Sequence, residues 1–481
     1  MLRRKPNIIK TQFVDVEVEN PSNAFEFKDH LSDVCRNKLL PAIEKLFDAK
    51  SSGTQIISID SLQINAGTLE KEDWENRLVE ETIKRLTEYL DNIQAGHIYG
   101  VQNQQAEAVK GSGVTLSDDG NESKAILHFL KFGVLPWYSS IKSQSELTAT
   151  FKGLINKDNK FIEEVRQLSI SDKKAFDRIV MQFAGESVIK ILVEESTKSL
   201  VEDLYISWRK IFEVLHISAQ EQKIKFFTAL RSVIHEGRTK RFTESITVMI
   251  QNTLEEEQWE LLVRVADKSD EYNFAEKEKH ILKYIRKDKN KKDEIKKDDA
   301  QKLFENNDDA TQLEENPIYI TNAGLVLLHP FISSLFANIG YTKKDEFISD
   351  ELQQRALVLC QYLVSGGDEY AEFELLLNKI LTGYAVEESL PSEIELSDFE
   401  KKEAEDLLKS VIKHWSALKN TSVEGLRQTF LQRDGKIVRA DTGWLLQVEQ
   451  NTVDILLNKL PWGFSTIKTP WMKEILSVEW T

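Results

Sequence analysis

The chain has 481 residues, of which 41% are hydrophobic and 30% charged, and its formal net charge is −16. This length exceeds what one hydrophobic core usually supports, so we expect roughly two to four domains. The negative balance argues against nucleic-acid binding, which needs a basic footprint, and gives no support to binding at an anionic membrane.

Targeting segments and disulfides are not expected either. The basic N-terminus lacks the apolar stretch of a signal peptide, and no apolar run is long enough to cross a membrane. The two cysteines, Cys35 and Cys360, each lie in an apolar helical pattern, which indicates buried thiols in a reducing compartment. We therefore expect a cytoplasmic protein.

The first region is predicted to be a small α+β domain. Apolar residues alternate with acidic ones over 13–18, which indicates a half-buried strand. Helical spacing follows over 25–47, where Pro41 should kink or split the helix. A second strand is predicted at 57–64 and a second helix at 74–90. The order is that of a β-α-β-α domain.

The middle of the chain is predicted to be helical between two linkers. Residues 94–121 offer almost no core positions and indicate a flexible linker. Helices are then expected at 123–132, 146–155, 160–168, 172–183, 186–214, 219–233 and 241–268. Residues 276–315 interleave basic and acidic side chains, which favours a charged linker or solvated helix, although the basic cluster could touch an acidic partner.

The last region is predicted to be an α+β domain. The expected elements are a strand at 318–320, helices at 325–339, 352–364, 373–381, 399–415 and 425–431, and a closing strand at 475–480. Asp441-Thr442-Gly443 between two apolar runs indicates a β-hairpin. Thr421 and Glu424 have the spacing of a capping box.

The predicted fold class is therefore mainly α with small α+β parts: an N-terminal β-α-β-α domain, a helical middle region, and a C-terminal α+β domain with a β-hairpin and a Pro/Trp-rich tail. The expected division is a small α+β domain at 1–93, a flexible linker at 94–121, a helical middle domain at 122–275, a charged linker at 276–315 and the C-terminal domain at 316–481.

Tryptophans that follow or accompany prolines mark the C-terminal tail. The indole of a tryptophan buries a large apolar area, and the prolines stiffen the path between them. Such residues either anchor a domain core or form an aromatic surface for a partner. The candidates for these two roles are Trp137, Trp462, Trp471 and Trp480.

A search for chemistry yields no catalytic residue, no cofactor site and no metal site. The histidines lack metal spacing, and neither paired cysteines nor a phosphate-binding loop occurs. His329 is expected to be a hydrogen-bonded core or turn residue, and Asn378-Lys379 the exposed face of the helix at 375–381. The best polar group comprises His414, Lys419, Asn420, Thr421, Glu424, Arg427 and Arg433. Capping and local pairing of Lys419 and Arg427 with Glu424 are favoured there over acid–base catalysis.

Several motifs resemble those of one family. They are Asn322-Ala323-Gly324-Leu325-Val326-Leu327-Leu328-His329-Pro330-Phe331, Leu376-Leu377-Asn378-Lys379, the stretch from His414-Trp415 to Leu431, Leu460-Pro461-Trp462-Gly463, Pro470-Trp471 and Val478-Glu479-Trp480. Upstream, Ile59-Asp60, Gly67-Thr68-Leu69, Phe129-Leu130 and Leu135-Pro136-Trp137 continue the match. This set resembles the contractile injection system tape-measure proteins, whereas residues 140–315 carry no motif that we can place.

The resemblance implies a non-enzymatic assembly component of a phage-tail-like particle that controls the length of its inner tube and sheath. Its implied partners are the inner tube, baseplate or cap proteins, and retention in the finished particle stays open. As one unbroken helix, the roughly 190 residues between the first linker and the last domain would reach about 290 Å. Repeated breaks argue that they fold back, so a folded assembly factor or adaptor is the alternative to a ruler. An effector or enzyme cargo is a third.

Overall fold

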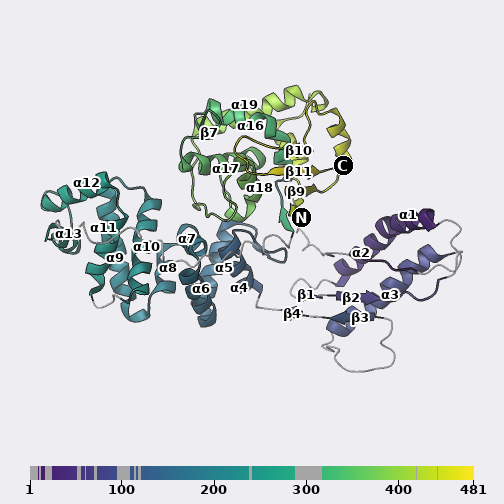
Figure 1. Cartoon of the computed structure of the whole chain (residues 1–481), viewed down its shortest axis with the longest axis horizontal. Coiled ribbons are helices and arrows are strands. Elements are labelled where there is room, and N and C mark those ends of the chain that lie inside the picture. The colour runs from purple at the N-terminus through teal and green to yellow at the C-terminus, as the bar shows by residue number, and fades with distance from the viewer. Residues whose placement is uncertain are drawn as a thin grey trace. The chain divides into compact units, whose positions relative to one another are not determined.

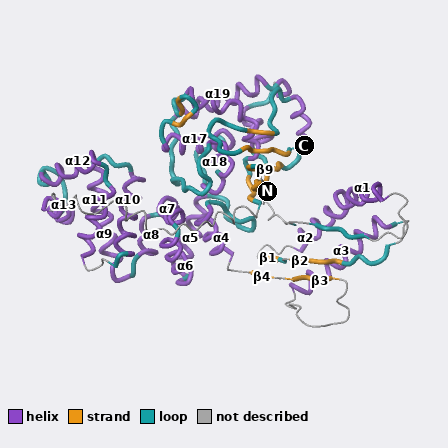
Figure 2. Tube along the Cα trace, in the orientation of Figure 1, coloured by secondary structure: helices purple, strands orange, loops and turns teal. Residues whose placement is uncertain are grey.

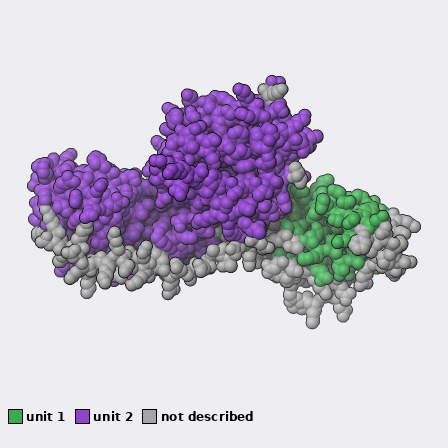
Figure 3. Space-filling model, turned by 45° about the horizontal axis from the view of Figure 1, so that its top comes forward, with its two compact units in different colours: residues 1–122, 138–140 green, residues 123–137, 141–481 purple. Residues whose placement is uncertain are grey.

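The structure is a computed structural model. It describes residues 9, 12–16, 24–50, 56–59, 61–69, 73–94, 109–112, 115–117, 121–237, 241–287, 317–418, 420–440 and 442–480. These residues are mainly helical (Figures 1 and 2) and fall into two compact units. Unit 1 comprises residues 1–122 with 138–140, and unit 2 comprises residues 123–137 with 141–481 (Figure 3).

Unit 1 combines helices with a two-stranded ribbon. Its elements are α1 (Ala24–Val34), a π-helical turn (Cys35–Leu39), α2 (Leu40–Lys50), β1 (Ile56–Ser58), β2 (Ser61–Ile64), α3 (Trp74–Gln94), β3 (Val109–Ser112) and β4 (Thr115–Ser117). The pairs β1–β4 and β2–β3 follow one antiparallel register, from Ile56 opposite Ser117 to Ile64 opposite Val109. Leu39, Ile43, Leu86 and Leu90 form the small core between the helices.

The predicted β-α-β-α order is not confirmed. No strand occurs in described residues 12–16, where Phe13 is 91% exposed, and the rest of the predicted strand lies outside the described residues. The expected strand at 57–64 is present as β1 and β2, and β3 and β4 fall within the range predicted as a linker. Pro41 lies at the second residue of α2, and the π-turn before it lets the chain continue without a full break.

Ten helices of the described residues form what we call the helical array, residues 121–287, which belongs to unit 2 apart from residues 121–122 and 138–140. They are α4 (Asn121–Phe132), α5 (Gln144–Lys157), α6 (Asn159–Ser171), α7 (Lys173–Gln182), α8 (Gly185–Leu192), α9 (Glu195–Val214), α10 (Ala219–His235), α11 (Phe242–Thr253), α12 (Glu256–Asp267) and α13 (Glu276–Lys287). Consecutive helices such as α5 and α6, or α10 and α11, pack on each other. Their inward faces share one hydrophobic core, which includes Phe151, Trp208 and Phe226.

Two joints between these helices consist of a single residue each. Asp158 ends α5 and caps α6 by accepting hydrogen bonds from the backbone N–H groups of Lys160 and Phe161. Asp172 ends α6 and caps α7 in the same way. The helices predicted at 186–214 and 241–268 are each divided in two, because Val193 with Glu194 and Leu254 with Glu255 adopt extended backbone angles.

The range predicted as a charged linker begins with α13. Its residues Ile281, Leu282 and Ile285 are buried in the array core, while Lys277 and Lys283 are exposed. This spacing of apolar residues gives a helix a core-facing stripe even when its overall charge is high. Residues 288–316 lie outside the described part of the chain.

What we call the C-terminal part, residues 317–480, packs helices around a five-stranded sheet. Its elements are β5 (Ile318–Ile320), a 3-10 helix (Ala323–Leu328), α16 (His329–Asn338), β6 (Thr342–Lys343), β7 (Glu346–Phe347), α17 (Asp350–Ser365), a 3-10 turn (Glu372–Glu374), α18 (Leu376–Thr382), α19 (Asp398–His414), a 3-10 turn (Ser416–Leu418), α20 (Val423–Leu426), a π-helical turn (Arg427–Leu431), β8 (Gly435–Ala440), β9 (Gly443–Val448), a 3-10 helix (Thr452–Lys459), β10 (Thr466–Ile467) and β11 (Ile475–Glu479).

The sheet confirms the predicted hairpin and the closing strand. Its order is β10-β11-β9-β8-β5, in which β8 and β9 are the antiparallel hairpin and β11 lies parallel to β9. The Pro/Trp-rich tail between the strands is fixed against α18. The hydroxyl of Thr469 donates to the Leu381 carbonyl at 2.7 Å, and a Cβ at Gly383 would lie 2.1 Å from the Trp471 carbonyl oxygen. The tail is therefore an integral layer of this part.

Basic side chains bind the carbonyl ends of helices throughout unit 2. The guanidinium of Arg231 donates to Ser169 and Ile170 at the end of α6, and that of Arg286 donates to Ala266 and Asp267 at the end of α12. Arg427 donates to Leu363 near the end of α17. These carbonyls have no partner within their own helix, so each donor removes the cost of a buried, unbonded polar group.

A buried carboxylate joins α19 to its neighbours. Glu400 is 5% exposed and completes a capping box with Ser397, while Arg355 donates to its two oxygens at 3.0 and 2.6 Å and Tyr341 donates through its hydroxyl. Burial alone would raise the pKa of Glu400, but these hydrogen bonds lower it to about 2.

We expect Glu400→Gln to destabilise the protein by about 3 kcal/mol at pH 7, because the folded-state pKa is depressed. The ionised carboxylate of Glu400 stabilises the folded protein fully at pH values above its unfolded pKa of about 4.5. This contribution is lost as the pH falls from about 4.5 to about 2. Urea unfolding at pH 7 and pH 3 checks this, with the exposed Glu395→Gln as control. A difference between variant and wild type that does not shrink at pH 3 would contradict it.

Candidate functional site

The polar residues singled out in the sequence do not converge. Arg427 pairs with Glu405, Arg433 binds both oxygens of Asp454 at 2.9 and 2.8 Å, Glu424 accepts from Gln428, and His414 contacts the Ser410 carbonyl. Ser422, and not Thr421, caps α20 by accepting from the Gly425 N–H at 3.0 Å. The predicted capping box is therefore wrong, because α20 starts one residue later than expected. The predicted Glu424–Arg427 pair is also wrong, because Arg427 pairs with the more distant Glu405. Lys419 lies outside the described residues.

The prediction for Asn378 and Lys379 is also wrong. Both were expected on an exposed face, yet Asn378 is 0% and Lys379 2% exposed. Every residue of their helix, α18, is buried. Its sequence offered no signal for this, because Asn378, Lys379 and Thr382 lie on one side of the helix and resemble the polar face of an amphipathic helix.

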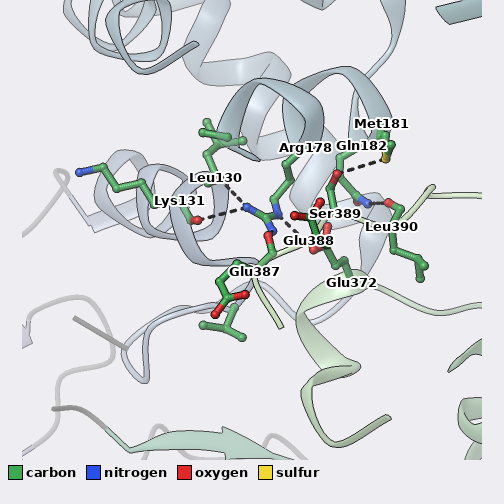
Figure 4. A network of polar contacts seen from close by, with 12 residues as sticks. Leu130, Lys131, Arg178, Met181, Gln182, Glu372, Glu387, Glu388, Ser389 and Leu390 are labelled. Atoms are coloured by element: carbon green, nitrogen blue, oxygen red, sulfur yellow. Dashed lines mark hydrogen bonds and ion pairs between the residues drawn. The ribbon is translucent and has the colours of Figure 1, made fainter. Parts of the chain in front are cut away.

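Lys379 belongs to a buried charged trio with Arg178 and Glu372, at the contact between the helical array and the C-terminal part. Figure 4 shows Arg178 and Glu372 of this trio. The guanidinium of Arg178, on α7, donates to Oε1 of Glu372 at 3.1 Å, and the ammonium of Lys379 donates to the same oxygen at 2.9 Å. The side chains of Arg178 and Glu372 have no solvent exposure. The sequence offered no local signal for this trio, since Arg178 and Glu372 are 194 residues apart.

Arg178 also binds backbone carbonyls on both sides of this contact. It donates to Leu130 at 2.7 Å and to Lys131 at 3.2 Å, both at the end of α4, and to Glu387 at 2.6 Å in the C-terminal part. Figure 4 shows its guanidinium between these groups. One side chain thus holds the end of α4 and a loop far along the chain.

That loop, residues 386–391, we call the strap. Each of its six backbone carbonyls accepts a hydrogen bond from a side chain. The pairs are Val386 with Lys379 at 3.2 Å, Glu387 with Arg178 at 2.6 Å, Glu388 with Lys379 at 2.7 Å, Ser389 with Tyr384 at 2.9 Å, Leu390 with Gln182, and Pro391 with Tyr370 at 2.8 Å. A segment that is largely covered but lacks regular structure needs such donors, because its carbonyls have no helical or sheet partners.

Gly133 gives the trio its space. It has a left-handed φ of +73°, and a Cβ there would lie 2.8 Å from Oε1 of Glu372 and 2.9 Å from Nη2 of Arg178. A larger residue would be strained and would also collide with the charged groups. Burial lowers the pKa of Lys379, and the neighbouring carboxylate of Glu372 opposes that shift.

The arrangement is suited to holding parts of the chain together. The donors of Lys379 are taken up by Glu372 and two strap carbonyls, and those of Arg178 bind Glu372 and three carbonyls. In the described part of the chain, no group of three or more His, Cys, Asp or Glu side chains could hold a metal ion.

The four candidate tryptophans lie in different surroundings. Trp480 is 2% exposed, with its N–H on Asp454 and Arg433 over its ring. Trp462 is half-buried, donates to the Leu327 carbonyl at 3.0 Å and meets Phe331 edge-on. Trp471, also half-buried, packs on Phe336 and Phe347, and Trp137 is half-buried near α4. Whether any of them contacts a partner stays a prediction.

Comparison with known protein families gives a match that covers nearly the whole chain. Residues 6–480 match the family described as contractile injection system tape measure protein. No curated protein and no solved structure matches the chain. Among the described residues, no helix has the length and apolar character needed to cross a membrane.

We expect Lys379→Met to destabilise the protein by about 3–5 kcal/mol, because it leaves two strap carbonyls and part of the Glu372 charge without a buried partner. The matched control is Lys401→Met, whose ion pair with Asp368 is at the surface and should contribute little to stability. Urea unfolding followed by circular dichroism measures both. Equal losses would show that the trio is not a stabilising contact.

We expect Trp480→Ala to cost about 3–5 kcal/mol, the usual range for truncating a buried aromatic residue. Trp462→Ala should cost less, because part of its indole is already in water. Thermal unfolding of the two variants compares them. An equal or larger loss for Trp462→Ala would mean that Trp462 is the main anchor of the tail.

Proposed function

The chain belongs to the contractile injection system tape measure protein family, and on this premise we propose that it acts as a folded assembly factor of the particle. In this role it docks on the baseplate, cap or tube end and helps to set where the inner tube and sheath stop growing. It acts without catalysis, by binding and steric exclusion. Assembly takes place in the cytoplasm.

The observation that carries this proposal is the folding of the middle region into short, packed helices. The longest helix of the array, α9, has 20 residues and spans about 30 Å. The array buries a shared core, and Arg178 fixes it to the C-terminal part through side chains without solvent exposure. A ruler of extended chain would have to give up both contacts.

If the chain acts in its folded form, its partners must bind to the surface of the folded parts. The half-buried Trp462 and Trp471 keep both of their predicted roles, as anchors of the C-terminal part and as contacts for a tube or baseplate protein. The buried position of Trp480 supports the anchor role alone. The family match is the basis for naming these partners.

A pair of variants distinguishes a folded factor from an extended ruler. The first deletes residues 241–287, the far end of the array, which as an unbroken helix would add about 70 Å. The second replaces the same residues by a Gly/Ser linker of equal length. Both leave the charged trio and the strap in place.

We expect the deletion not to shorten particles in proportion and the linker replacement to behave like the deletion, because the folded surface matters and the contour length does not. Electron microscopy of assembled particles measures tube length. Particles shortened by the deletion, together with normal length for the linker replacement, would establish a ruler and overturn the proposal.

A further inference from the structure

The helical array and the C-terminal part keep separate cores. Phe151 and Trp208 belong to the core of the array, while Leu359 and Trp415 belong to that of the C-terminal part. Among the described residues, few apolar side chains of one region pack into the core of the other. Phe132 and Val134, at the end of α4, lie in the C-terminal core, and the partly buried Phe373 packs against the array core.

The contact between these cores, which we call the seam, consists largely of polar groups. Besides the charged trio, Gln182 on α7 donates to Leu390, and the hydroxyl of Ser392 donates to the Met181 carbonyl at 3.4 Å. The seam also contains two buried oxygens without a hydrogen-bond partner, Oε2 of Glu372 and Oε1 of Gln182. Buried oxygens of this kind weaken the contact, because they lose their hydrogen bonds to water and gain no hydrogen bond in the protein.

The charges of the trio do not balance. Two cations, Arg178 and Lys379, share a single carboxylate oxygen of Glu372. The cost of removing these charges from water offsets much of their attraction, so a buried ionic contact holds its parts in a defined arrangement with little net stability. Polar contacts between compact regions of one chain commonly permit relative motion.

We propose that the seam is a latch, which opens by release of Arg178 from Glu372 and the strap while the two cores stay folded. The pivot is the end of α4, where the chain passes from the array core at Leu130 to the C-terminal core at Phe132. A partner that prefers the open arrangement shifts the population by its difference in affinity for the two states. This inference does not depend on the role of the protein in tube assembly.

Distance measurements in the full chain test the latch. Spin labels on Lys283→Cys in α13 and Lys413→Cys in α19 report the separation of the two regions. Both positions are exposed, Cys35 is replaced by Ser, and Cys360 is fully buried and needs no change. Double electron–electron resonance is recorded for this chain and for the same chain with Glu372→Gln or Arg178→Met.

We expect one narrow distance distribution for the unmodified seam. Each seam variant should add a broad, longer component, with the open fraction rising by on the order of a hundredfold. Amide exchange in α10 and α17 should stay slow, which would show that both cores remain folded. The matched control is Arg166→Met, which removes a helix-end contact with Ile191 inside the array and should leave the distribution narrow.

Two results would overturn the latch. One is an unchanged narrow distribution in both seam variants. The other is fast amide exchange in α10 and α17 together, which would mean that the trio is part of a single cooperative core. Glu372→Gln keeps the shape of the side chain, so it separates a loss of charge from a loss of packing.

Discussion

The carbonyl groups at helix ends are the constraint on which unit 2 depends. The last carbonyls of a helix have no partner within it and carry the negative end of the helix dipole, so they need donors from elsewhere. Left-handed glycines do this for α17 and α18, at Gly366 and Gly383. Several array helices end instead in extended residues, and arginines from other helices approach their carbonyls.

The seam applies the same solution between two regions. Arg178 donates to the Leu130 carbonyl at the end of α4. Because its guanidinium charge is buried there, it requires a buried counter-charge, which the carboxylate of Glu372 provides. Glu372 in turn binds Lys379, whose remaining donors hold the strap. Each step follows from the cost of leaving the previous group without a partner. A helix-end contact has therefore become the joint between two cores, and Gly133 provides its space.

The sequence allowed prediction of those features that depend on neighbouring residues. Helical spacing located most helices, and Asp441-Thr442-Gly443 located the hairpin between β8 and β9. The breaks at Glu194 and Glu255 were missed, because neither glycine nor proline marks them. The charged trio could not be predicted from the sequence, because no residue near Arg178 in the sequence indicates a contact with Glu372. Lys379 was assigned to the surface, because it shares one side of α18 with Asn378 and Thr382, as on the polar face of an amphipathic helix.

The family name raises the question of how a folded chain could contribute to length control. To serve as an extended ruler, the array would have to expose aromatic side chains such as Phe151, Phe161 and Phe226, each of which contributes about 1.5–3 kcal/mol by burial. It would also release the arginines from their helix ends. An extended ruler would therefore lose this burial free energy along the array, and contacts with the tube wall would have to replace it. A folded array needs no such compensation, and this difference in cost is the physical reason for our proposal that the chain acts through the dimensions and contacts of its folded parts.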